Sequence, residues 1–124
     1  HYYPNRHANG IDTSGILILE YPDFVCQCTA AKDSSAHNSA QIIGSDGNIL
    51  IEPGSNNCKK LVVTRKGKEP YISDISDTPW WYEILNISNF LIAPQDSVYE
   101  QRTRAMRSTV AVLEAARKDA HLDF

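Results

Sequence analysis

The strongest constraint on the fold of this chain comes from residues 14–52, which have the sequence SGILILEYPDFVCQCTAAKDSSAHNSAQIIGSDGNILIE. Side chains alternate between the two faces of a strand, so a sheet with one wet face alternates apolar with polar residues. The runs ILIL, QII and ILI are instead apolar at consecutive positions. Both faces of the sheet that these strands form are therefore expected to be covered.

Turn-forming residues divide the first two thirds of the chain into seven expected strands. Asn9-Gly10 and Pro22-Asp23 separate the first three, and the D-G pair at 46–47 between two apolar runs is a strong indication of a β-hairpin. The expected strands cover residues 2–8, 14–21, 24–32, 41–44, 48–52, 60–65 and 69–75. Their short connections predict that most of them pair as antiparallel neighbours.

Two helices are expected after the last strand. Thr78 as N-cap and Pro79 in the first turn predict the start of one helix, which Pro94 ends. Ser97 and Glu100 form a capping-box pattern that predicts a second helix reaching residue 120. Apolar residues at helical spacing are Trp80, Ile84, Ile87 and Leu91 in the first helix, and Met106, Val110, Leu113 and Ala116 in the second. The set in the second helix is expected to be buried.

These elements predict a single α+β domain over residues 1–124, an open and largely antiparallel or mixed sheet of about six or seven strands with two C-terminal helices packed on one face. A chain of this length can bury one core but not two. Two helices cover only one sheet face, so we expect a second protein surface, in a symmetric homodimer, to cover the other. The candidate residues for this dimer face are Ile16, Leu17, Ile18, Leu19, Ile49 and Ile51.

Composition and charge argue against several classes of function. A net charge of −3 with 22% charged residues gives no basic surface for nucleic acid or for an anionic membrane. Apolar runs stay well short of the roughly 18 residues that a membrane span needs. The chain begins at His1 rather than Met and lacks a leader-like segment, so it is expected to be a piece of a longer protein.

The three cysteines indicate a reducing compartment, and the cytoplasm is the expected location. Cys26 and Cys28 share one face of an expected strand, where small apolar side chains fit. The alternative is a zinc site that adds Cys58 and a histidine, but the spacing does not match that of the usual paired zinc ligands. Core packing is the favoured interpretation.

The motifs of the chain do not assemble into a catalytic constellation. The six glycines form neither a dinucleotide loop nor a P-loop, and the G-S-D-G sequence at 44–47 is expected to be a hairpin turn. Lys32, followed by Asp33 at a strand end, could orient a substrate, although an exposed ion pair is the favoured interpretation. Trp80 and Trp81 could line an apolar pocket, with a core anchor as the alternative for at least one of them.

The succession of segments along the chain resembles a known family. NGID at 9–12, GILILEYPDF at 15–24, NSAQIIGSDGNILIEP at 38–53, a helix with YEI at 82–84 and a final LEAARKDAHLDF look like the C-terminal domain of the Gfo/Idh/MocA oxidoreductases. Within that family, the stretch from residue 38 to residue 63 is most similar to the dihydrodiol or xylose dehydrogenase-like branch. The resemblance covers nearly the whole chain, and it depends on the order of the motifs because each motif is short.

The resemblance implies the C-terminal domain of an NAD(P)-dependent oxidoreductase that acts on a sugar, polyol or diol. Such a domain supplies walls of the substrate pocket and the dimer interface, and it packs toward an N-terminal Rossmann domain. The family's Gly-rich loop, its Glu-Lys-Pro segment with the catalytic lysine and its Asp-x-x-x-His segment would all precede His1. The chain alone is therefore expected to bind no cofactor and to be inactive, with NAD or NADP bound by the parent protein. The alternative is a free-standing binding or interaction module that uses an apolar sheet face.

Overall fold

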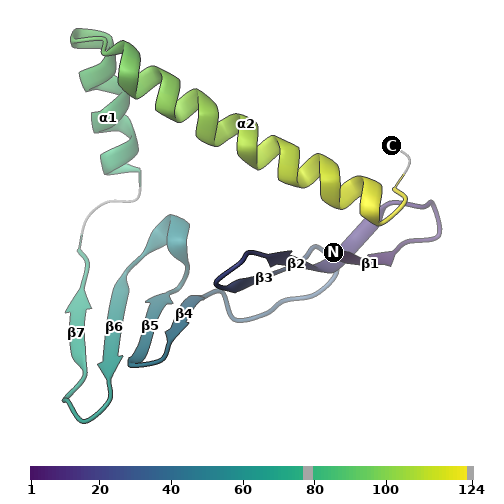
Figure 1. Ribbon diagram of the computed structural model, residues 1–124, viewed down its shortest axis with the longest axis horizontal. Coiled ribbons are helices and arrows are strands. Elements are labelled where there is room, and N and C mark those ends of the chain that lie inside the picture. The colour runs from purple at the N-terminus through teal and green to yellow at the C-terminus, as the bar shows by residue number, and fades with distance from the viewer. Residues whose placement is uncertain (77–79, 123–124) are drawn as a thin grey trace. The chain divides into compact units, whose positions relative to one another are not determined.

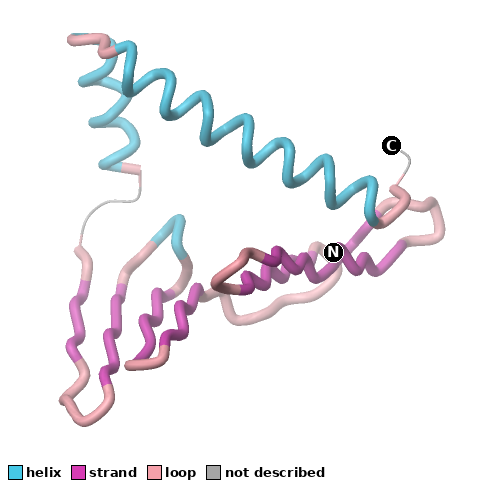
Figure 2. Tube along the Cα trace, in the orientation of Figure 1, coloured by secondary structure: helices cyan, strands magenta, loops and turns pink. Residues whose placement is uncertain are grey.

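The computed structural model describes residues 1–76 and 80–122 and shows an α+β fold (Figure 1). The described strands all precede the two α-helices, as the sequence predicts (Figure 2). The strands are β1 (Tyr2–Arg6), β2 (Asp12–Glu20), β3 (Val25–Ala31), β4 (Ala40–Gly44), β5 (Gly47–Glu52), β6 (Lys60–Arg65) and β7 (Tyr71–Asp74). The helices are the short 3-10 helix η1 (Ser55–Asn57), α1 (Trp81–Ile92) and α2 (Asp96–Asp119). In the described chain, no helix has the combined length and apolarity of a membrane-crossing segment.

The seven strands form two antiparallel sheets, whereas the sequence predicted one. β1, β2 and β3 are neighbours in the first sheet, and β4, β5, β6 and β7 follow one another in the second. The polar segment 32–39 between β3 and β4 contains no Gly or Pro that would form a tight hairpin turn. The residues fall into two compact units, the first made of 1–36 with 95–124 and the second of 37–94.

The central strand of the first sheet, β2, contains a β-bulge. Residues 5 and 6 of β1 pair with residues 14 and 12 of β2, which leaves Thr13 as the extra residue. A bulge shifts the alternation of side chains by one position, so Asp12 projects from the same face as Tyr2. The hydroxyl of Tyr2 donates a hydrogen bond to Oδ2 of Asp12 over 2.6 Å.

The C-terminal end of α2 covers the free edge of β1. The backbone N–H of Tyr2 donates to Oδ2 of Asp119 over 2.8 Å. The guanidinium of Arg6 donates to the carbonyl oxygen of Ala120. Ala120 and Leu122, at 7% and 4% exposure, are the buried apolar residues of the described chain. These contacts protect an edge that could otherwise pair with another strand.

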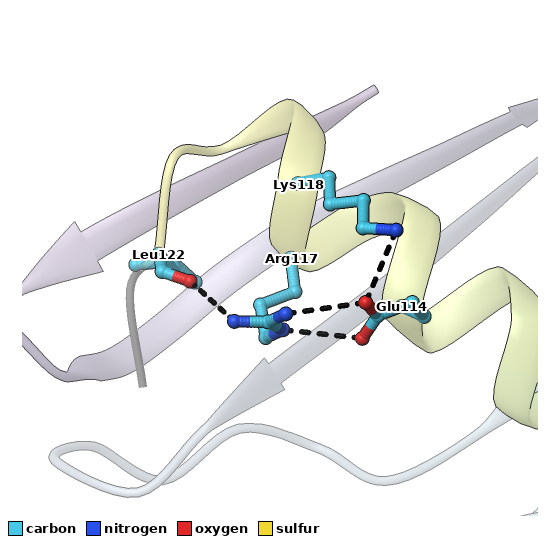
Figure 3. Close-up of polar contacts among 4 residues, drawn as sticks. All are labelled: Glu114, Arg117, Lys118 and Leu122. Atoms are coloured by element: carbon cyan, nitrogen blue, oxygen red, sulfur yellow. Dashed lines mark hydrogen bonds and ion pairs between the residues drawn. The ribbon is translucent and has the colours of Figure 1, made fainter.

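Arg117 fixes the segment that follows α2 (Figure 3). Its guanidinium donates to both carboxylate oxygens of Glu114 at 3.2 Å and to the carbonyl oxygen of Leu122 at 2.9 Å. Nζ of Lys118 lies 3.3 Å from the same carboxylate. The hydrogen bonds from Arg117, and then from Lys118, hold the pKa of Glu114 below its ordinary value. Two cations in the last turn also interact favourably with the negative end of the helix dipole.

The starts of the helices differ from the capping patterns in the sequence. α2 begins at Asp96 after an extended Gln95, so Ser97 lies inside the helix and the predicted capping box is wrong. Asp96 places a carboxylate in the first turn, where the helix dipole stabilises negative charge. The predicted cap at Thr78 and Pro79 lies outside the described residues.

The apolar stripes of both helices are exposed. Met106, Val110 and Leu113 of α2 are 64%, 59% and 59% exposed, so the prediction that this stripe is buried is wrong. The cause is that α2 contacts the sheet of its unit through its last turn and not through the stripe. α1 buries none of its residues either, and Leu91 is 73% exposed. The two helices therefore present apolar side chains that the described chain leaves uncovered.

Candidate functional site

An apolar row crosses all four strands of the second sheet. In an antiparallel sheet, residues directly opposite each other project from the same face. The strand pairings therefore place four large side chains in line. We call these residues, Ile42, Ile49, Val63 and Tyr71, the apolar row. Ile42 and Tyr71 are 59% and 62% exposed, and the two central residues are half-buried.

The opposite face of this sheet is mixed in character. Glu52, Lys60 and Asp74 pair across β5, β6 and β7 and form a charged row at one end. Asn48 pairs with Thr64 near the other end. Leu50, Val62 and Ile72 also pair in line on this face, between the charged and the amide side chains. The prediction of two apolar faces therefore holds only in part for this sheet, and we call the face of the apolar row its apolar face.

The predicted dimer-face residues of the second sheet lie on its apolar face. Ile49 belongs to the apolar row, and Ile51, two positions along β5, projects from the same side. Ile51 pairs with Leu61 of β6, and both side chains are half-buried. The apolar surface thus extends beyond the row.

The other predicted dimer-face residues lie in β2 and are divided between the two faces of the first sheet. Leu17 and Leu19 share a face with the two cysteines of β3, whereas Ile16 and Ile18 share the other face with its Gln and Thr. Ile16 is 39% exposed, and the other three are half-buried. No single face of the first sheet therefore contains all four.

A hollow of about 320 Å³ lies beside the turn between β4 and β5, at one end of the apolar row. Ile42, Ile49 and Val63 line it, together with Arg65 and residues 44–47. A Cβ at Gly47 would overlap with the backbone carbonyl of Thr64 in β6, so this position requires glycine. The hollow could accept a small apolar group.

Trp80 and Trp81 lie at the start of α1. Trp80 is the N-cap residue, in a left-handed conformation with φ of 72°, and Trp81 is the first residue of the helix. Their side chains are 63% and 53% exposed, so neither is a core anchor in the described chain. Adjacent exposed indole rings can bind a flat or partly apolar ligand surface.

Lys32 follows the last residue of β3 and belongs to the first unit, whereas Trp80 and Trp81 belong to the second. Neither unit by itself therefore contains all three predicted pocket residues. Its backbone N–H donates to the carbonyl oxygen of Thr13 over 2.7 Å. The neighbouring Asp33 accepts hydrogen bonds from the hydroxyl of Thr13 at 2.6 Å and from the side-chain amide of Asn5 at 3.3 Å. The Thr13 hydrogen bond is the main reason that the pKa of Asp33 lies below its ordinary value. This polar cluster fixes the bulge and the loop after β3.

The thiols of the first sheet form a close pair. Sγ of Cys26 lies 3.8 Å from Sγ of Cys28. Burial, followed by the neighbouring Cys26 thiol, raises the pKa of Cys28. Cys58 belongs to the second unit, where its thiol contacts the carbonyl oxygen of Lys60. Among the described residues, no group of three or more His, Cys, Asp or Glu side chains is placed to hold a metal ion.

The glycines at 44 and 47 lie in a hairpin turn and do not form a dinucleotide-binding loop. The G-S-D-G sequence at 44–47 joins two antiparallel strands, and Gly44 pairs directly with Gly47. A pyrophosphate loop instead leads from a strand to a helix N-terminus, where free N–H groups bind the phosphates.

Comparison with known proteins leaves the family open. No protein-family model matches the chain, and no curated protein matches it. The resemblance to the Gfo/Idh/MocA oxidoreductases therefore stays a prediction from the sequence.

Proposed function

We propose that the chain is the substrate-side and assembly domain of an NAD(P)-dependent oxidoreductase that acts on a sugar, polyol or diol. The apolar row is the main observation in support, because a sheet face that exposes Ile42 and Tyr71 is suited to pack against a second protein surface. The order of the elements is further support. The segments that resemble the Gfo/Idh/MocA family lie on β2, on the β4–β5 hairpin, on α1 and at the end of α2.

In this proposal the Rossmann domain of the parent protein binds NAD or NADP and the parent supplies the acid–base groups. Hydride transfer requires a bound nicotinamide and a positioned proton acceptor. The present chain supplies pocket walls, for which the exposed rings of Trp80 and Trp81 are suited. The three free cysteines suit a reducing compartment such as the cytoplasm.

The apolar face of the second sheet is assigned to a homodimer interface. Burial of about 1,000 Å² of mostly apolar surface at about 25 cal/mol per Å² gives a gross gain of about 25 kcal/mol. That gain exceeds the roughly 4 to 15 kcal/mol that association costs. A two-fold axis would place the apolar row of one copy against the apolar row of the other. Two-fold symmetry is the commonest symmetry of soluble homo-oligomers.

The full-length translation product that contains these residues tests the assignment. Supplied with NAD or NADP and with aldoses, polyols and trans-diols in turn, it should reduce one dinucleotide with at least one substrate class. Titration calorimetry should show dinucleotide binding to the full-length product and no micromolar binding to residues 1–124 alone. A full-length product that neither binds a dinucleotide nor turns over would contradict the proposal.

Alanine variants of the two tryptophans test the pocket walls. Trp80→Ala and Trp81→Ala should raise KM of the full-length enzyme more than they lower kcat, because a ring that only binds substrate acts equally on ground and transition states. Both rings are more than half exposed, so the loss of stability should be well below the roughly 3 to 5 kcal/mol of a core tryptophan. Leu91→Ala, also exposed on α1, is the control, and it should leave KM unchanged. Unchanged KM in both tryptophan variants would remove these residues from the pocket.

The second candidate function is a free-standing interaction module. The hollow beside the β4–β5 turn favours it, because an apolar side chain of a partner could pack there against Ile42, Ile49 and Val63. In that case the full-length product would bind neither dinucleotide, while Ile42→Glu would abolish capture of the partner. Dinucleotide binding by the full-length product separates the two candidates.

A further inference from the structure

The thiol pair of β3 has no part in the proposed function. Gln27 separates Cys26 from Cys28, so both side chains project from one face of the strand, with 3.8 Å between their Sγ atoms. Cys26 is half-buried and Cys28 is exposed, which leaves the pair open to a small reagent. We propose that Cys26 and Cys28 form a reversible redox site, which a low-molecular-weight disulfide such as glutathione disulfide converts into a disulfide within the strand.

The geometry of β3 permits this bond and makes it easy to reduce. Alternate residues of an extended strand have Cα atoms about 6.6 Å apart, which is close to the upper limit of about 6.8 Å for a disulfide. β3 is an edge strand that pairs with β2 alone, so its backbone can bend to bring the two residues closer. A disulfide near the limit of its geometry is strained, and strained disulfides are the readily reduced ones.

The reaction requires two exchange steps. The thiolate of one cysteine attacks a sulfur of glutathione disulfide, the glutathione S–S bond breaks, and one glutathione leaves as a thiolate that takes up a proton. The thiolate of the second cysteine then attacks the protein sulfur of this mixed disulfide and displaces the second glutathione, which also takes up a proton. Two protein thiols are oxidised, and one glutathione disulfide is reduced to two glutathiones. Excess reduced glutathione reverses both steps.

Mass spectrometry of the complete 124-residue chain tests the proposal. Cys58→Ser removes the third thiol and leaves the pair as the reactive site. After treatment with glutathione disulfide, this variant should lose both alkylatable thiols, keep no bound glutathione and give a peptide with Cys26 joined to Cys28. Excess reduced glutathione should restore both thiols.

Two further variants on the Cys58→Ser background act as controls. Cys28→Ser should accumulate a stable glutathione adduct on Cys26, because no second thiol resolves it. Cys28→Ser combined with Thr29→Cys keeps two thiols but places them on opposite faces of β3, and it should likewise retain glutathione. Glutathione that stays bound to both cysteines of the Cys58→Ser variant, or disulfides that form between chains, would overturn the proposal.

Discussion

The ring and the hydroxyl of Tyr2, in β1, both contact residues of the neighbouring strand β2. The ring lies over Gly15, where a Cβ would overlap with it, and the hydroxyl donates to Asp12 over 2.6 Å. Burial of the phenol, and then the Asp12 carboxylate, raise the pKa of Tyr2 to about 12. An unfolded tyrosine loses its proton near pH 10, so between about pH 10 and 12 the folded chain binds more protons than the unfolded one. The free energy of unfolding should therefore fall as pH rises through this window.

Tyr2→Phe should lower the free energy of unfolding by about 1 to 2 kcal/mol near neutral pH, because it removes a hydrogen bond to a carboxylate. Between about pH 10 and 12, the free energy of unfolding of this variant should also fall less than that of the unaltered chain, because the variant lacks the Tyr2 hydroxyl. Tyr3→Phe is the matched control, since the side chain of Tyr3 is 63% exposed on the opposite face. Urea unfolding at neutral pH and at about pH 11 measures both effects. If the free energy of unfolding fell equally between neutral pH and about pH 11 in Tyr2→Phe and in the unaltered chain, Tyr2 would not be the cause of the fall.

At the scale of single residues, the sequence predicted positions better than contacts. Trp80, Trp81 and Lys32 lie near element ends, as expected, but the Tyr2–Asp12 pair was not predicted. With strict alternation along β2, Asp12 would project from the face opposite to Tyr2. The bulge at Thr13 places the two side chains on the same face. The exposure of a helical side chain also depends on whether its helix finds a partner, which a periodic pattern does not reveal.

The β4–β5 hairpin depends on Gly47 at the end of its turn. Gly47→Ala should destabilise the chain by about 1 to 3 kcal/mol, because the added methyl group would overlap with the backbone carbonyl of Thr64 and force β5 and β6 apart. Gly44→Ala is the matched control, since its Cβ would meet the nearest atom at an ordinary 3.6 Å. Denaturant unfolding of the two variants compares them. If Gly44→Ala lowered the free energy of unfolding as much as Gly47→Ala, overlap with Thr64 would not explain the loss of stability.

At the scale of elements, the sequence predicted the seven strands and the two α-helices of the described residues, but neither the short helix η1 nor the division of the strands between two sheets. Apolar runs and turn residues specify strands locally, and the D-G pair at 46–47 correctly indicated a hairpin. The pairing of Gly44 with Gly47 fixes the register of β4 with β5, so Ile42 opposite Ile49 could have been found by pairing outward from that turn. Val63 and Tyr71 depend on the separate registers of β5 with β6 and of β6 with β7. The division into two sheets depends on the path of residues 32–39, for which the sequence contains no pattern.

The whole molecule is expected to self-associate through the apolar row. Ile42→Glu places a charge at the proposed interface and should weaken the dimer at least about tenfold, which corresponds to about 1.4 kcal/mol. Ile43→Glu is the matched control, because the adjacent side chain is 79% exposed on the opposite face of β4. Light scattering coupled to size-exclusion chromatography measures the mass of each variant. Dissociation by both substitutions, or by neither, would mean that the apolar row is not the interface.

The contacts between β1 and the end of α2 also determine when the first unit can be completed during synthesis. Residues 37–94 form the second unit, so the ribosome makes all of it after β3 and before α2. Asp119, which binds the edge of β1, is made 88 residues after the end of β3 at Ala31. At about 5 to 20 residues per second, the edge of β1 stays unprotected for roughly 4 to 18 s after its sheet has emerged. During that interval the nascent chain can pair with other strands, and a chaperone that binds extended segments would act on β1 before α2 exists.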